Sequence, residues 1–296
     1  MNIILRRRQH RAGWAFASPA LILIALFYFV PVFGGLFLSF TDFDIYAIGR
    51  PDTARLVGFS NYHKALTDPM FWKALGNTLI FVGIGGPLSV IASLAAALMV
   101  TSKLARMPGV YRSVFFLPVV TTLVAVAIVW RYLFHTQYGL LNWMLGGIGI
   151  APIDWLGNPH WAMFAIIVMA VWKNFGYNML IFVAGLQSIP DELYEAAALD
   201  GADAWTRFVH VTVPQLGPTL LFVGVMTMLG NFQLFSEPYV MTQGGPLGAT
   251  TTIVMLMYEQ GFRWWRMGLA SAIAFLLFAI MLAGTAIQVR VQKVTR

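Results

Sequence analysis

The chain has 296 residues, of which 59% are hydrophobic and 10% are charged. Soluble domains carry about 25% charged residues, so this composition excludes a water-soluble protein and indicates a membrane protein. The net charge is +7, but the Lys and Arg residues lie between apolar runs rather than in one stripe, which argues against a nucleic-acid partner.

Six apolar segments are long enough to cross a bilayer as helices. They lack the alternation of β-barrel strands, so we predict an all-α, polytopic membrane protein with six transmembrane helices. The first segment follows RRRQHR and is too long for the apolar core of a signal peptide, so we expect it to be retained. In chain order the six segments are residues 14–40, 75–100, 113–134, 162–186, 219–235 and 267–289.

The distribution of positive charge predicts the orientation. Placing the N-terminus inside puts eleven of the 19 Lys and Arg residues on the cytoplasmic side, as the positive-inside rule expects. We therefore predict a basic cytoplasmic N-terminus over residues 1–13, a transmembrane domain over residues 14–290 and a cytoplasmic C-terminal tail over residues 291–296.

Span four carries a polar stripe formed by Lys173, Asn174, Tyr177 and Asn178, which repeat at helical i, i+4 spacing. Lys173 follows Trp161 by twelve residues, about 18 Å along a helix, which places it near the middle of the membrane. An unpaired ammonium there is costly, and ionisable residues inside a membrane usually face a cavity. We therefore predict a substrate pathway along this stripe, although hydrogen bonds that only hold helices together are an alternative.

The segment over residues 187–217, between spans four and five, is acidic where a cytoplasmic loop is usually basic. Ser188 resembles a helix N-cap, so we expect a short helix over residues 189–200 that ends at Gly201. A second turn is expected over residues 203–210, with Pro214 and Pro218 leading into span five.

Span five adds further polar and small residues to the predicted substrate pathway. Thr227 and Asn231 share one helical face, with Gly230 and Gln233 beside them. Two acidic residues after this span, Glu237 and Glu259, are expected to be solvated surface acids. Gating of the cargo or contact with an external protein is the alternative for both.

The acidic loop carries a family resemblance. Glu195, Ala196 and Ala197 are followed after three residues by Gly201 and after nine more by the sequence VTVP, which ends at Pro214. This spacing resembles the EAA motif in the membrane subunits of bacterial ATP-binding-cassette importers, with valines in place of the usual Ile and Leu. The stretches YRSVFFLP, AGLQSIPDELYEAAALDGA and YVMTQGGPLGATTTIV resemble the maltose-permease-like members of the carbohydrate importers.

The resemblance implies a set of partners. These are a second permease subunit, a cytoplasmic ATPase dimer that binds ATP and Mg²⁺, and an external sugar-binding protein, all at the bacterial inner membrane with its lipid. It implies no cofactor and no metal in this chain. It also implies that the polar residues of spans four and five line a sugar pocket, and that the coupling residues contact the ATPase. Those coupling residues are Glu195, Ala196, Ala197, Asp200, Gly201 and Pro214.

Two points stay open within this interpretation. Lys173 either contacts an anionic cargo or pairs with an acidic group on the second permease. The small residues of span two, from Gly83 to Ser93, either pack against that second subunit or kink the helix.

Other function classes are less well supported. A secondary, ion-coupled transporter is the alternative, but it would require inverted repeats and broken helices in matching halves, which the sequence does not reveal. An enzyme would require a converging acid, base or metal set, and the sequence contains no cysteine, no GxxxxGK[ST] phosphate loop and no HExxH motif. We therefore expect a transport subunit rather than an enzyme.

Overall fold

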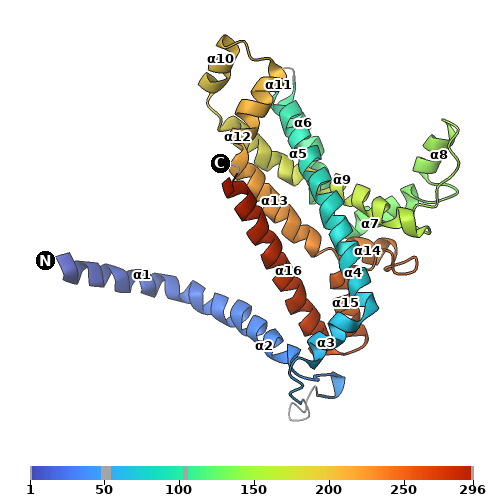
Figure 1. Cartoon of the computed structure of the whole chain (residues 1–296). Coiled ribbons are helices and arrows are strands. Elements are labelled where there is room, and N and C mark those ends of the chain that lie inside the picture. Colours follow the sequence, from blue (N-terminus) through green and yellow to red (C-terminus); the bar gives the residue numbers. More distant parts are fainter. Residues whose placement is uncertain (1, 48–54, 103–105, 295–296) are drawn as a thin grey trace. The chain divides into compact units, whose positions relative to one another are not determined.

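Figure 1 shows a computed structural model that describes residues 2–47, 55–102 and 106–294, with side chains from residue 13 to residue 291. Three residues that entered the charge distribution, Arg50, Lys103 and Arg296, lie outside the described residues.

Six membrane spans are compatible with the structure. Four continuous helical stretches are long and apolar enough to cross a membrane: Gly13–Ser39, Pro69–Thr101, Pro159–Gln187 and Met267–Val291. Two more candidates are bent pairs of helices, Pro108–Val120 with Leu123–Leu133 and Ala204–Gln215 with Gly217–Phe232. Counting each bent pair as one span gives the six predicted, and the all-α, polytopic fold class is confirmed.

The first break was not expected, because span three was predicted to be one unbroken helix over residues 113–134, whereas Pro214 and Pro218 already predicted the second break, ahead of span five. The first pair bends by 96° and the second by 68°. The first break follows Pro118, after which Thr121 and Thr122 adopt extended conformations. The second break lies at Leu216, just before Pro218. Proline lacks the N–H that continues a helix and its ring clashes with the preceding turn, which accounts for both positions.

The chain divides into two units, of which the first contains residues 1–67 and 257–276. In this unit the Asn61 amide donates to the carbonyls of Ser39 (3.0 Å) and Thr41 (2.7 Å), which ties α3 (Ser60–Thr67) to the end of α2 (Val30–Ser39). The helices that begin in this unit are α1 (Asn2–Ile24), η1 (Ala25–Phe29), α2 (Val30–Ser39), η2 (Ile45–Ala47), α3 (Ser60–Thr67), η6 (Glu259–Arg263) and α16 (Met267–Val294).

The second unit contains residues 68–256 and 277–296, and the end of α16 belongs to it. Its other helices are α4 (Pro69–Ile80), η4 (Phe81–Gly85), α5 (Gly86–Thr101), α6 (Pro108–Val120), α7 (Leu123–Leu133), α8 (Leu140–Gly146), α9 (Pro159–Gln187), α10 (Asp191–Leu199), α11 (Ala204–Arg207), η5 (Phe208–Thr212), α12 (Val213–Gln215), α13 (Gly217–Phe232), α14 (Ser236–Met241) and α15 (Ile253–Tyr258), whose last two residues belong to the first unit.

Helix α9 is the central helix of the second unit and packs against α5, α6 and α13. It begins where the Asn158 side chain accepts a hydrogen bond from the His160 N–H (2.9 Å), with Pro159 in the first turn. One apolar cluster includes Ile166 in its first half, and another includes Phe182 in its second half; both side chains are fully buried. The polar residues 173–178 lie between these two clusters.

The small residues in the middle of span two pack inside this chain. Gly85, Gly86, Ser89 and Ser93 are all buried within it. A Cβ at Gly85 would contact Ile167 of α9, and one at Gly86 would lie 3.4 Å from the Asn231 amide of α13. The expectation that these four residues face a second subunit is therefore wrong. Gly83 is exposed, and it is the glycine of this group that remains available to face that subunit.

Gly176 allows α9 to approach α6 closely, and this gives a first prediction. A Cβ at this position would overlap the carbonyl oxygen of Phe115 and lie 3.1 Å from the Cα of Phe116. Because overpacking costs about 1–3 kcal/mol, we expect Gly176→Ala to lower the thermal unfolding midpoint of the purified complex. Gly76→Ala in α4 is the control, since a Cβ there has no atom within 4 Å. Equal midpoints for both variants would contradict the close approach.

Candidate functional site

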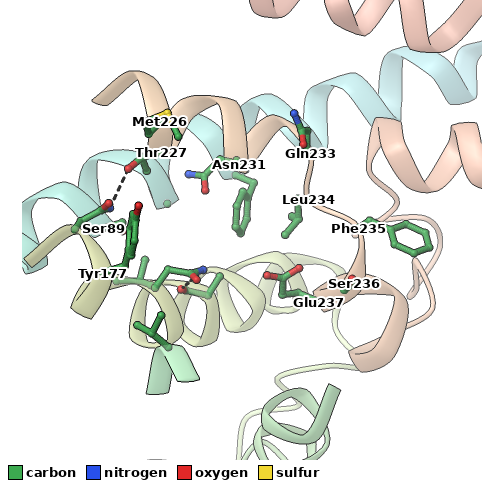
Figure 2. A pocket seen from close by; sticks show the side chains of 18 residues that line it. Ser89, Tyr177, Met226, Thr227, Asn231, Gln233, Leu234, Phe235, Ser236 and Glu237 are labelled. Carbon is green, nitrogen blue, oxygen red and sulfur yellow. Dashed lines mark hydrogen bonds between the residues drawn. The ribbon is translucent and has the colours of Figure 1, made fainter. Parts of the chain in front are cut away.

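A cavity of about 380 Å³ lies in the second unit, lined by residues of η4, α5, α9, α13 and α14 and by Val119 of α6 (Figure 2). Its volume falls within the range of about 300–1,000 Å³ that is typical of small-molecule sites. Such sites combine apolar and aromatic walls with a few placed polar groups, and this wall has both.

Helix α9 contributes three polar residues to the wall, Asn174, Tyr177 and Asn178. The Asn178 amide donates to Thr227 Oγ1 of α13 (2.9 Å), which fixes the two helices on either side of the cavity. The Asn174 amide donates to the Ala170 carbonyl of its own helix (3.0 Å). The Tyr177 side chain is half exposed, and its ring offers a flat aromatic surface.

The end of α13 contributes Thr227, Gly230, Asn231 and Gln233. The helix ends at Phe232, and the Gln233 N–H caps it by donating to the carbonyls of Asn231 and Gly230. A Cβ at Gly230 would meet no atom within 4 Å, so this glycine leaves open space beside the cavity. Seven of the eight residues predicted for the substrate pathway therefore meet around one cavity.

The eighth residue, Lys173, is not among the lining residues. It is 6% exposed, and its Nζ donates to the Val119 carbonyl (3.0 Å), one residue before the end of α6. The last carbonyls of a helix have no partner within the helix and carry partial negative charge, so the ammonium stabilises the broken end. Lys173 therefore does not belong to the same cavity-facing stripe as its three neighbours.

Glu237 of α14 is a site residue that the sequence interpretation missed. It was expected to be a solvated surface acid, but it is only 8% exposed and lines the cavity. Its charge and that of Lys173 attract each other. The signal in the sequence was the buried lysine itself, because a mid-membrane ammonium requires a partner, and Glu237 is the acid that follows span five most closely.

The acidic segment over residues 187–217, predicted to contact the ATPase, forms a second candidate site at the end of the second unit where α10 lies (Figure 1). Helix α10 covers Asp191–Leu199 and has no buried residue. Glu195, Ala196 and Asp200 are exposed and Ala197 is partly exposed. The Tyr194 hydroxyl and Thr212 Oγ1 lie 3.0 Å apart, which joins α10 to η5. The helix thus presents its surface outward while one residue anchors it.

Gly201 ends α10 in a Schellman motif. Its φ is +81°, the left-handed conformation that glycine adopts most readily. The Ala202 N–H donates to the Ala197 carbonyl (2.9 Å) and the Gly201 N–H donates to the Ala198 carbonyl (3.1 Å), which is the pattern of this motif. The spacing between the alanines and the glycine therefore reflects the geometry of a helix end.

The start of α10 differs from the prediction. Ser188 is not its N-cap, because this residue closes the last turn of α9 with its hydroxyl on the Gly185 carbonyl (2.7 Å). Pro190 occupies the N-cap position instead. The expected second turn is present as α11 and η5, and Pro214 lies in α12.

Asp203 is the N-cap of α11. Its carboxylate accepts a hydrogen bond from the Thr206 N–H (2.8 Å). Hydrogen bonding to Thr206 lowers the pKa of Asp203 below its usual value, because these bonds favour the charged form. The turn between α10 and α11 is thus held at both ends, by Gly201 and by Asp203.

Comparisons with known proteins place the chain in a family. Residues 88–296 match the family described as "Binding-protein-dependent transport system inner membrane component". The chain is 38% identical to the lactose transport system permease protein LacF of Rhizobium radiobacter, over 88% of this chain and 86% of that protein. It is 33% identical to the trehalose/maltose transport system permease protein MalF of Thermococcus litoralis, over 99% and 97%.

A solved structure shares the fold. A chain from a bacterial ABC transporter involved in the import of the acidic polysaccharide alginate superposes with a TM-score of 0.80 at 21% identity, covering 99% of both chains. Although two spans are broken, the family match decides against a secondary transporter and against an enzyme. The chain belongs to the family of binding-protein-dependent transport system inner membrane components, the permease subunits of ATP-binding-cassette transporters.

Proposed function

We propose that this permease subunit forms half of the import pathway for a sugar or oligosaccharide, and that the cavity between α9, α13 and α14 contacts this cargo. The observation that carries the proposal is the meeting of Asn174, Tyr177 and Asn231 around one cavity. Amide groups both donate and accept hydrogen bonds, as sugar hydroxyls require, and the relatives named for lactose and for trehalose and maltose support a carbohydrate cargo.

The energy for import comes from a separate ATPase, and we propose that α10 is its contact in this chain. The support is structural: α10 buries none of its residues, and Gly201 and Asp203 fix the turn that follows it. A helix that is rigid at its end and exposed along its length can bind the ATPase and pass on the ATPase's movement to the membrane spans attached to the helix. In the proposed orientation both termini and α10 lie on the cytoplasmic side.

The remaining partners follow from the first span and from the family. The most apolar part of the first span, within Gly13–Ser39, is not buried by its own unit, and lipid and a second permease subunit are proposed to cover it. An external sugar-binding protein is proposed to deliver the cargo, in keeping with the description of the family. ATP and Mg²⁺ would be bound by the ATPase dimer.

The direct test uses the complete importer. The two permeases, the ATPase and the binding protein are reconstituted in vesicles, and uptake is measured for lactose, trehalose, maltose and an oligomannuronate. Saccharide uptake that depends on ATP and on the binding protein is the expected result. Uptake of none of these, with uptake of a cargo from another chemical class, would reject the carbohydrate assignment.

Lys173 provides a second prediction, because the hypothesis of an anionic cargo depends on it. Its ammonium donates a hydrogen bond to the Val119 carbonyl, and its charge is attracted by that of Glu237. Both interactions favour a role inside the chain over contact with the cargo. We therefore expect Lys173→Met to lower the thermal unfolding midpoint of the complex, since it leaves Glu237 buried without its counter-charge. Lys173→Arg, which keeps the charge, is the matched control. A selective loss of oligomannuronate uptake in Lys173→Met at an unchanged midpoint would instead support the anionic cargo.

A further inference from the structure

Glu237 is the one charged side chain among the described residues that line the cavity. Figure 2 shows its side chain extending from α14 into the space between α9 and the end of α13, where the Leu234 side chain also lies. The other polar groups of the wall are amides and hydroxyls, which are neutral. A cargo that enters the cavity therefore meets a single acidic group.

The backbone that carries Glu237 is held in place. Arg131 of α7 donates to the Val240 carbonyl (3.4 Å), and Thr242 Oγ1 donates to the Pro238 carbonyl (3.0 Å). The rings of Phe235 and Tyr239 stack with centroids 5.1 Å apart. The short helix α14 thus presents Glu237 from a fixed position, as a binding group requires.

Lys173 is not among the residues that line the cavity. Its Nζ is fixed on the Val119 carbonyl (3.0 Å), and its charge attracts that of Glu237. The two side chains form no ion pair within 4 Å in the described part of the chain, where the one such pair is Arg263 with Glu259. Lys173 therefore offsets part of the cost of burying the carboxylate without occupying its oxygens.

The Glu237 carboxylate accepts a hydrogen bond from its own backbone N–H and keeps its remaining lone pairs for a ligand. When ionised it only accepts hydrogen bonds, and it offers about four lone-pair sites. Two neighbouring sugar hydroxyls can donate to its two oxygens, and such charge-assisted bonds are roughly twice as strong as neutral ones. A carboxylate, sulfonate or phosphate on the cargo offers no donor there and is repelled.

We propose that Glu237 is a specificity-determining residue that selects a neutral saccharide by accepting hydrogen bonds from two adjacent hydroxyls and that excludes acidic saccharides. Lys173 is its positioning residue. This inference rests on the proposed function, because it requires that the cavity receives a saccharide.

The test measures saccharide binding to the assembled permease and ATPase complex without the binding protein, so that selection by that protein does not mask the cavity. Saturation-transfer NMR is applied with lactose, maltose and trehalose as neutral probes and dimannuronate as the acidic probe. We expect the parent to bind a neutral probe and not dimannuronate. Glu237→Gln should weaken the neutral probe about tenfold or more and admit dimannuronate, as expected on loss of a charged partner.

Two further variants make the result specific. Glu259→Gln removes an acid outside the cavity lining and should bind like the parent. Lys173→Met should weaken the neutral probe and admit dimannuronate, and adding it to Glu237→Gln should change neither probe further, because the two act as one unit. Loss of fold alone would weaken the neutral probe without admitting dimannuronate.

Two outcomes would overturn the proposal while leaving the importer assignment in place. One is a parent that binds dimannuronate as well as its neutral probe. The other is a Glu237→Gln variant that keeps the parent's preference. A parent that binds no saccharide, and that takes up none in the complete importer, would instead reject the proposed function on which this inference depends.

Discussion

Glu195→Lys and Gly201→Val are expected to abolish cargo-stimulated ATP hydrolysis in the reconstituted importer while the complex still assembles. Coupling between two sites is typically worth about 1–3 kcal/mol, or 5- to 150-fold, so stimulation should fall by more than about tenfold. Glu195 is exposed on α10, so reversing its charge changes the surface offered to the ATPase without removing a contact inside this chain.

Gly201 acts through the backbone. A Cβ there would meet no atom within 4 Å in this chain, but φ is +81°, a conformation that costs other residues about 1–2 kcal/mol. Valine should therefore distort the end of α10, whereas Gly201→Asn, which tolerates this conformation better, is the matched control and should keep most of the stimulation. Glu195→Gln should lie between the parent and Glu195→Lys. Full stimulation in Glu195→Lys and Gly201→Val complexes that assemble normally would show that α10 is only a linker.

Local sequence signals predicted much of the fold and the grouping of residues at both candidate sites. Apolar segment length predicted six spans, a number compatible with the structure when each bent pair counts as one, because a bilayer imposes a length on every crossing helix. Helical spacing predicted that Asn174, Tyr177 and Asn178 act together, and all three line one cavity. The position of Gly201 predicted where α10 ends, because the left-handed residue of a helix end is a local property.

The features that were missed depend on contacts distant in sequence. Pro118 lies within an apolar run, and hydropathy carries no information on the direction in which a chain continues after a proline. Lys173 donates to a carbonyl 54 residues earlier in the chain, so the helical spacing that grouped it with Asn174 could not show where its side chain goes. Glu237 follows an apolar span like an ordinary loop acid, and its burial arises only because α14 packs against α7 and α9.

Gly230→Leu is expected to block cargo uptake without unfolding the subunit. A Cβ at Gly230 would meet no atom within 4 Å, and Gly230 lines the cavity, so a leucine side chain has room to extend into the space that the cargo is proposed to occupy. The helix itself should gain stability, because glycine costs about 1 kcal/mol in a helix interior. Uptake should therefore fall by about tenfold or more while the unfolding midpoint holds or rises, since the added side chain displaces cargo from its contacts.

Gly76→Leu is the matched control for this variant. Gly76 of α4 belongs to the same unit and also has no atom within 4 Å of a Cβ, but it does not line the cavity. Uptake by Gly76→Leu should stay near the parent's value in complexes that contain all subunits. The decisive comparison is between transport and ATP hydrolysis, because a filled cavity leaves α10 and its contact with the ATPase unchanged. Gly230→Leu should therefore keep its basal ATP hydrolysis while it loses uptake, and a variant that imports cargo normally would show that the pathway does not pass through this cavity.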